Sequence, residues 1–227
     1  ISGFKILESS WILGSFGDMY PIGVSLDGSV TAGFGYLSPY GRVSVFWQDD
    51  QIRGIFGLPD EGLSTYVVDS TPTAISLDGV VAGVFTLYDQ FLRIRLPGIF
   101  VWSSLGGVRR IYEGYNPVVP VAVSASGTTI VARAGAGMDA YRFKLDPDTG
   151  EYVSDDLNIT YRRLLQSGER LFSPDALSPD GRYIVGRGYN GRLYLLDTAP
   201  RRDGDVDNNG CVDDADLLDV LFAFGNT

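Results

Sequence analysis

Short apolar segments alternate with turn residues along most of the chain. Four segments align without gaps on a shared order of proline, small residue, aliphatic residue, serine and turn glycine: PIGVSLDG from Pro21, PTAISLDG from Pro72, PVAVSASG from Pro120 and PDALSPDG from Pro174. Their serines are spaced 51, 48 and 54 residues apart. An apolar, β-branched segment follows each motif, so each motif predicts a strand, a tight turn and a second strand.

The turn chemistry of the motif suggests what its residues do. Asp-Gly or Ser-Gly supplies the positive φ that a two-residue hairpin turn requires. The proline is expected at the first position of its strand, where no ladder N–H is needed. A nucleophile is not needed four times, so we interpret the repeated serines as structural, and the turn aspartates likewise: Ser25, Ser76, Ser124 and Ser178, with Asp27, Asp78 and Asp180.

A second hairpin follows in each repeat. It is predicted over Val43–Leu58, Ile99–Tyr112 and Tyr141–Val153, and Asn190-Gly191 supplies the corresponding turn in the last repeat. About four short strands in a repeat of about 50 residues is the organisation of β-propeller blades. The sequence therefore predicts an all-β fold, a β-propeller over residues 1–197, in which only Leu157–Leu171 is ambiguous.

The ends of the repeat region leave two arrangements open. Phe4–Gly17 resembles the outer hairpin of a blade without its inner strands, and the last repeat has little room for a fourth strand. Either this hairpin completes the last blade and closes a ring of four, or the chain is a fragment of a larger ring. We favour the larger ring, because four blades are the low end of the known range.

Charge separates a second region from the repeats. Of the 28 acidic residues, seven lie after Arg202, where none of the 18 basic residues is found. We therefore expect a linker over 198–202 and a distinct segment over 203–227.

The acidic segment has the spacing of a calcium loop. Counted from Asp205, oxygen ligands fall at loop positions 1, 3, 5, 9 and 12, glycine stands at position 6, and the carbonyl of position 7 completes the set: Asp205, Asp207, Asn209, Cys211, Asp213 and Asp216. Leu217, Leu221 and Phe224 then share one face of a predicted helix. The expected ion is Ca²⁺, which takes six to eight oxygen ligands.

Two family resemblances follow from these motifs. The repeats, with Phe46-Trp47 and Phe100-Val101-Trp102 on their outer strands, resemble the HAF repeats of bacterial extracellular proteins. That resemblance implies a secreted or surface-displayed propeller without defined chemistry. The tail resembles one repeat of a dockerin, which implies a cohesin-like or cell-surface protein partner. A dockerin has two such loops, and Asp214 and Ala215 stand where many dockerins carry the Ser or Thr that contacts cohesin.

Composition excludes several classes of site. The chain has no histidine and one cysteine, which excludes histidine bases, histidine-ligated metals and an intrachain disulfide. A pI near 4.4 argues against nucleic-acid binding, and no apolar run is long enough to span a membrane.

Two functions remain. The first is a non-catalytic, extracellular or cell-surface binding or scaffold protein attached through its calcium segment. The second is a polysaccharide-degrading enzyme, a glycoside hydrolase or lyase that uses carboxylates. Polysaccharide is a candidate ligand in both. A glycosidase would need one of the five glutamates paired with an aspartate, but the sequence shows no pair at the required separation, so we interpret the glutamates as dispersed surface carboxylates and assign no catalytic residue: Glu8, Glu61, Glu113, Glu151 and Glu169.

Overall fold

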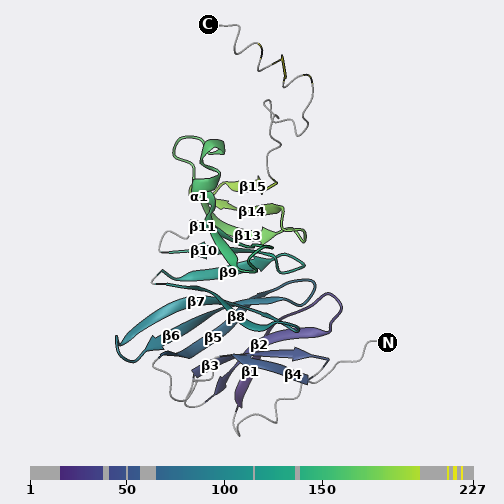
Figure 1. Cartoon of the computed structure of the whole chain (residues 1–227), viewed down its shortest axis with the longest axis vertical. Coiled ribbons are helices and arrows are strands. Elements are labelled where there is room, and N and C mark those ends of the chain that lie inside the picture. Colours follow the sequence, from purple (N-terminus) through teal and green to yellow (C-terminus); the bar gives the residue numbers. More distant parts are fainter. Residues whose placement is uncertain are drawn as a thin grey trace. The chain divides into compact units, whose positions relative to one another are not determined.

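The computed structural model describes residues 16–37, 41–49, 51–56, 65–114, 116–135 and 139–199, together with Asp214, Leu217, Leu218 and Leu221. The chain divides into two units, Ile1–Leu196 and Asp197–Thr227. The first unit is all-β and contains four antiparallel sheets, each with its strands in chain order (Figure 1).

The first sheet contains β1 (Phe16–Val24), β2 (Val30–Leu37), β3 (Gly41–Gln48) and β4 (Gln51–Phe56), and the second contains β5 (Thr65–Ile75), β6 (Val81–Asp89), β7 (Ile94–Ser103) and β8 (Gly107–Glu113). The third contains β9 (Val118–Val123), β10 (Thr129–Ala134), β11 (Asp139–Leu145) and β12 (Tyr152–Asp156). The fourth contains β13 (Leu171–Leu177), β14 (Tyr183–Gly188) and β15 (Leu193–Asp197). The ambiguous segment between the third and fourth sheets forms a short helix α1 (Leu157–Thr160) and a 3₁₀ turn η1 (Arg162–Leu164).

The four predicted strand–turn–strand motifs are confirmed, and each forms the first hairpin of its sheet. The predicted second hairpins are also confirmed: they form the third and fourth strands of the first three sheets, and in the last repeat the predicted turn joins β14 to β15. The turn itself is longer than predicted. Only its glycine has positive φ, from +73° at Gly28 to +82° at Gly79. The glycine N–H donates to the serine carbonyl, as between Gly28 and Ser25 at 3.0 Å, and the serine N–H closes the hairpin.

The prediction that each proline begins its strand is wrong. Each one lies inside the first strand of its sheet, which is an edge strand, and the residue directly after it is left out of the pairing register. Proline is tolerated at such β-bulges, where its missing N–H breaks no ladder bond. The four bulge residues are Ile22, Thr73, Val121 and Asp175.

The core lies between consecutive sheets, as in the blades of a propeller. Phe46 of β3 stacks on Trp102 of β7 with ring centroids 4.7 Å apart. Ile99 of β7 packs in one cluster with Ile130 of β10, and Leu157 of α1 fills the junction between the third and fourth sheets. Trp102 is buried in the core cluster between the first and second sheets.

The question of ring closure is not answered by the described residues. Of the Phe4–Gly17 hairpin, only Phe16 and Gly17, which begin β1, belong to them. Among the described residues the fourth sheet has three strands, as its short sequence predicts.

Candidate functional site

The repeated serines hold the hairpin turns. The hydroxyl of Ser124 accepts the N–H of Thr129 at 3.0 Å, and the equivalent bonds in the other repeats run from Val30 to Ser25, from Val80 to Ser76 and from Tyr183 to Ser178. Ser25, Ser76 and Ser124 are buried. Their hydroxyls satisfy backbone donors, which is the structural role that the repetition predicts.

Asp27 and Asp180 complete this arrangement in their turns. The hydroxyl of Ser25 donates to Asp27 at 2.6 Å, and the backbone N–H and hydroxyl of Ser29 donate to the same oxygen. These bonds, that from Ser25 above all, lower the pKa of Asp27 to about 2. The pKa of Asp180 is lowered for the same reason by Ser178.

The described glutamates are separate from one another and lie near arginines. Glu113 is 3.4 Å from Arg110, Glu151 is 3.5 Å from Arg109, and Glu169 is 4.0 Å from Arg192. Glu8 and Glu61 lie outside the described residues.

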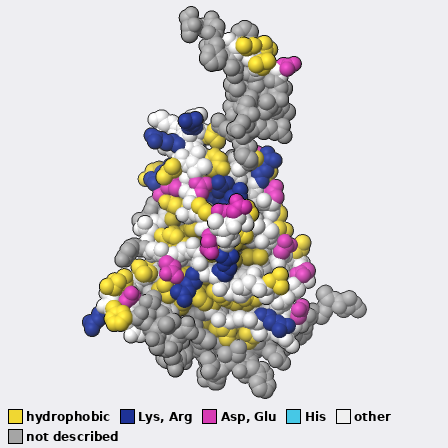
Figure 2. Space-filling model, viewed as in Figure 1, with side chains coloured by type: hydrophobic (Ala, Val, Ile, Leu, Met, Phe, Trp, Pro, Cys, Tyr) yellow, Lys and Arg dark blue, Asp and Glu magenta, His cyan; other side chains and the backbone are white. Residues whose placement is uncertain are grey.

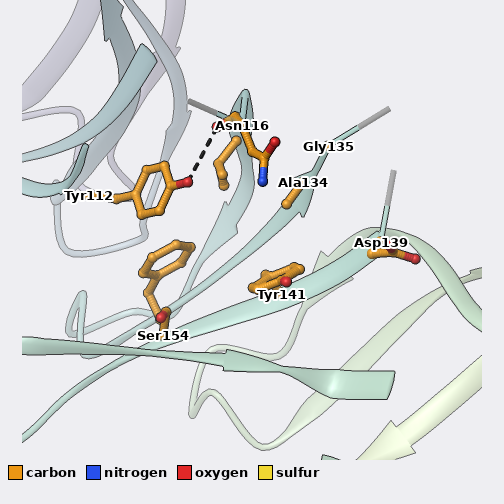
Figure 3. A pocket seen from close by; sticks show the side chains of 9 residues that line it. Tyr112, Asn116, Ala134, Gly135, Asp139, Tyr141 and Ser154 are labelled. Carbon is orange, nitrogen blue, oxygen red and sulfur yellow. Dashed lines mark hydrogen bonds between the residues drawn. The ribbon is translucent and has the colours of Figure 1, made fainter. Parts of the chain in front are cut away.

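A cavity of about 340 Å³ lies between the second and third sheets (Figure 3). Its polar lining comes from Tyr112 of β8, Asn116, Asp139 and Tyr141 of β11, and Ser154 of β12. The remaining lining is small or apolar: Val118, Ala134, Gly135 and Phe143. The Tyr112 ring meets the Phe143 ring edge to face at 6.0 Å, and its hydroxyl donates to the carbonyl of Asn116 at 3.4 Å.

The cavity carries little net charge. The Asp139 carboxylate is paired through Oδ2 with Arg170 at 2.7 Å, while its Oδ1 is buried without a partner among the described residues. Partial burial raises the pKa of the Tyr141 hydroxyl, and the carboxylates of Asp156 and Asp139 act in the same direction. Tyr141 therefore remains a neutral hydrogen-bonding group over the physiological range. Aromatic faces beside hydroxyl and amide groups suit a neutral, hydroxyl-rich ligand.

A second hollow of about 380 Å³ crosses the innermost strands. All four bulge residues line it, because a bulge redirects a side chain that would otherwise follow the strand alternation. The rest of its lining is mostly small or apolar, and its one carboxylate is Asp175, which pairs with Arg187 at 3.0 Å. A third cavity of about 110 Å³ beside β15 is also lined by one carboxylate, Glu169.

All six predicted calcium ligands, Asp205, Asp207, Asn209, Cys211, Asp213 and Asp216, lie outside the described residues. In the described parts of the chain no three histidine, cysteine or acidic side chains are grouped as a metal would require. Asp214, Leu217, Leu218 and Leu221 are helical, and the three leucines are 49–58% exposed.

The face of the molecule drawn in Figure 2 is mixed in charge. Acidic and basic side chains are interspersed among apolar ones on the visible face (Figure 2). No described helix has the length and apolar character needed to cross a membrane.

Sequence reasoning missed the cavity between the second and third sheets. Its polar residues come from separate strands and from a connection, so no local motif contains them. One sequence feature points to this cavity. At Tyr141-Arg142-Phe143 the third repeat departs from the Phe and Trp pattern of the first two repeats.

No protein-family model matches the chain, and no curated protein matches it. Solved structures similar to it include a putative TolB from Agrobacterium tumefaciens, with 16% identity, a TM-score of 0.45, and coverage of 77% of this chain and 60% of that one. TolB from Acinetobacter baumannii has 15% identity, a TM-score of 0.44, and coverage of 79% and 41%. The chain thus spans less than two thirds of the length of either protein. Likenesses of this strength do not assign a function.

Proposed function

We propose that the chain is a non-catalytic extracellular binding protein, in which a propeller-like domain holds a neutral, hydroxyl-rich ligand and the 203–227 segment binds Ca²⁺ and attaches the domain to a protein partner. The observation that carries the first part is the distribution of carboxylates. Each of the three cavities described above has one carboxylate in its lining, and each of these is paired with an arginine. Glycoside hydrolysis generally requires two carboxyl groups facing one bond.

The ligand class follows from the cavity between the second and third sheets. Tyr112 and Tyr141 provide aromatic surface and hydroxyls, Ser154 adds a further hydroxyl, and the ion pair of Asp139 with Arg170 compensates the negative charge. A sugar unit of a polysaccharide presents apolar ring faces and hydroxyls at once, so it matches this lining.

The experiment is a calorimetric titration of the full chain with a panel of soluble plant and bacterial oligosaccharides. We expect binding of one class, and we expect Tyr141→Ala to weaken it by about tenfold, the equivalent of about 1.4 kcal/mol, through loss of one stacking ring. Tyr36→Ala is the matched control, because Tyr36 is half exposed on the first sheet, away from this cavity. Failure of the whole panel to bind at concentrations of about 10 mM would contradict the ligand assignment. Release of new reducing ends would contradict the non-catalytic role.

The calcium part of the proposal rests on the loop spacing of the 203–227 segment and on the helical residues within it. Leu217 and Leu221 are four positions apart and share one helix face, yet they are 58% and 56% exposed. Exposed leucines at this spacing provide an apolar surface for a protein partner.

Calcium binding is tested on the full chain by titration with CaCl₂ after treatment with a chelator. We expect Asp205→Asn or Asp216→Asn to weaken binding by at least about tenfold, since each removes a charged ligand. Asp214→Asn is the matched control, because it removes the same charge at a loop position that supplies no ligand. Equal binding by all three variants, or no heat at millimolar calcium, would refute the assignment.

A further inference from the structure

The β6–β7 hairpin ends in an exposed apolar loop. Its strands pair as far as Asp89 and Ile94, and the loop between them carries Phe91 and Leu92, which are 84% and 65% exposed. Single exposed apolar side chains are common on protein surfaces, whereas two adjacent ones at the end of a hairpin form one contiguous apolar point. We define the hairpin tip as residues 90–93.

The hairpin tip projects from the second sheet. Strand β6 has nine residues, whereas its equivalents β2, β10 and β14 have eight, six and six. The β7–β8 ladder ends at Gly98, so the β6–β7 hairpin extends beyond it. Figure 1 shows this end of the second sheet reaching further to the left than the third sheet. At the corresponding edge of Figure 2, apolar side chains lie beside a basic one.

Hydrogen bonds fix the backbone of the hairpin tip. One oxygen of the Asp89 carboxylate accepts the N–H groups of Phe91 and Leu92, at 2.8 and 2.9 Å. Arg93 then has a φ of 53°, in the left-handed region that side chains other than glycine rarely adopt. Because the loop is already ordered, little conformational entropy is lost when it binds a partner.

Two arginines at the hairpin tip carry available positive charge. Arg93 and Arg95 are exposed, and neither side chain has a hydrogen bond or an ion pair with a described residue. On the neighbouring strand β8, by contrast, Arg109 lies 3.5 Å from the carboxylate of Glu151. The apolar point is therefore bordered by cations that an anionic partner can bind.

Amphipathic aromatic residues lie directly behind the tip. Tyr88 is paired with Arg95 on one neighbouring strand and with Tyr66 on the other, so the three side chains share one face of the sheet. The two tyrosine rings meet edge to face with their centroids 5.8 Å apart, and both residues are half-buried. Tyrosine is enriched where apolar lipid meets water, because its ring is apolar and its hydroxyl is polar. The hairpin thus has the layered chemistry of a bilayer surface.

We propose that the hairpin tip inserts into the surface of a membrane that contains anionic phospholipids, with Phe91 and Leu92 at the acyl chains and Arg93 and Arg95 at the lipid phosphates. A protein face is a poorer partner, because two side chains on a convex point bury little area, whereas specific protein interfaces generally bury ~1,200–2,000 Å². Lipids close around a projecting apolar point, and anionic headgroups attract the arginines. This contact is independent of the ligand cavity and of the 203–227 segment.

The proposal is tested by cosedimentation of the full chain with vesicles of phosphatidylcholine and phosphatidylglycerol in equal amounts, and with phosphatidylcholine alone. A chelator is present, so that Ca²⁺ does not bridge acidic residues to lipid phosphates. We expect binding to the mixed vesicles that weakens as salt is added, because salt screens the arginines. Phe91→Ser and Leu92→Ser should each weaken binding by about tenfold, and Arg95→Gln by about fivefold. Leu105→Ser is the matched control, because Leu105 is a fully exposed leucine in the β7–β8 turn, at the opposite end of β7.

Insertion itself is measured with Phe91→Trp, which keeps an aromatic residue at the hairpin tip. Compared with wild type, this variant should show additional tryptophan emission that shifts to shorter wavelength on mixed vesicles and is quenched by brominated acyl chains. Failure of wild type to bind mixed vesicles at millimolar lipid overturns the proposal, as does wild-type affinity in both serine variants or an equal loss in Leu105→Ser. Binding without quenching of the Phe91→Trp emission also overturns it, as does tip-dependent binding to a protein by a chain that binds no vesicles.

Discussion

Ser124→Ala tests whether the repeated hydroxyl stabilises the fold. Ser124 is completely buried, and its Oγ accepts the N–H of Thr129 at 3.0 Å. The backbone bond from Ser124 N–H to the Thr129 carbonyl, 2.8 Å long, does not need the hydroxyl and should persist. The substitution therefore removes one acceptor and leaves one donor beside the 6%-exposed Thr129 without a partner.

The size of the effect follows from that unpaired donor. A buried N–H that loses its acceptor costs ~1–3 kcal/mol, and we expect about 2 kcal/mol of lost unfolding free energy. For a chain of this size the thermal midpoint should fall by about 4–8 °C. Thermal and urea unfolding followed by circular dichroism measure both quantities.

Ser126→Ala is the control, because Ser126 lies in the same turn but is exposed, and its hydroxyl contacts that of the exposed Thr128. Its effect should stay within about 0.5 kcal/mol. Equal stability of the two variants would refute the proposed role of the serine. A loss of ligand binding by Ser124→Ala at unchanged stability would refute it in another way, by indicating that the hydroxyl contacts ligand.

Three further substitutions extend this reasoning. Hydrogen bonds from Ser25 and Ser29 lower the folded-state pKa of Asp27 from 3.8 to about 2. The ionised carboxylate therefore stabilises the fold at pH values above its unfolded pKa, and this stabilisation is lost as the pH falls toward the folded pKa. Asp27→Asn should therefore flatten the acid side of a melting-temperature profile, and an unchanged slope would contradict the mechanism. Trp102→Ala removes the ring stacked on Phe46 and should cost ~3–5 kcal/mol in urea unfolding, whereas a loss below about 1 kcal/mol would count against inter-sheet stacking. Thr73→Val removes a 2.9 Å bond to a carbonyl of the third sheet and should cost about 1 kcal/mol by the same assay, with no change expected if water replaces the bond.

The hairpins were predictable because their signals are local. A serine, a turn glycine and a β-branched segment within ten residues define strand, turn and strand, as the β9–β10 hairpin illustrates. The position of Pro120 was not predictable in the same way. A bulge is a property of two paired strands, and the sequence of one strand does not contain the register of its partner.

The cavity between the second and third sheets was unpredictable for a related reason. Tyr112 and Ser154 are distant in the sequence and line the same cavity only because consecutive sheets pack face to face. Likewise, the exposure of Val185 has no local signal, since its neighbours in sequence resemble those of Val131, which is buried. Whether such a residue is buried depends on what covers its sheet.

Repetition within one chain also separates structural from functional positions. The serine and glycine of the motif recur because every turn needs the same acceptor and the same positive φ, and their contacts account for both. The residue after the proline is free to vary, because the bulge takes it out of the ladder and directs it into the inner hollow, where it is Ile22, Thr73, Val121 and Asp175 in turn. A position that the fold does not constrain is one that binding can specialise. Substitutions of Ile22 and Val121 should therefore change what the inner surface binds with little change in stability, whereas substitutions of the repeated serine should do the reverse. Thr73 is an exception among the bulge residues, because its hydroxyl bonds to the third sheet.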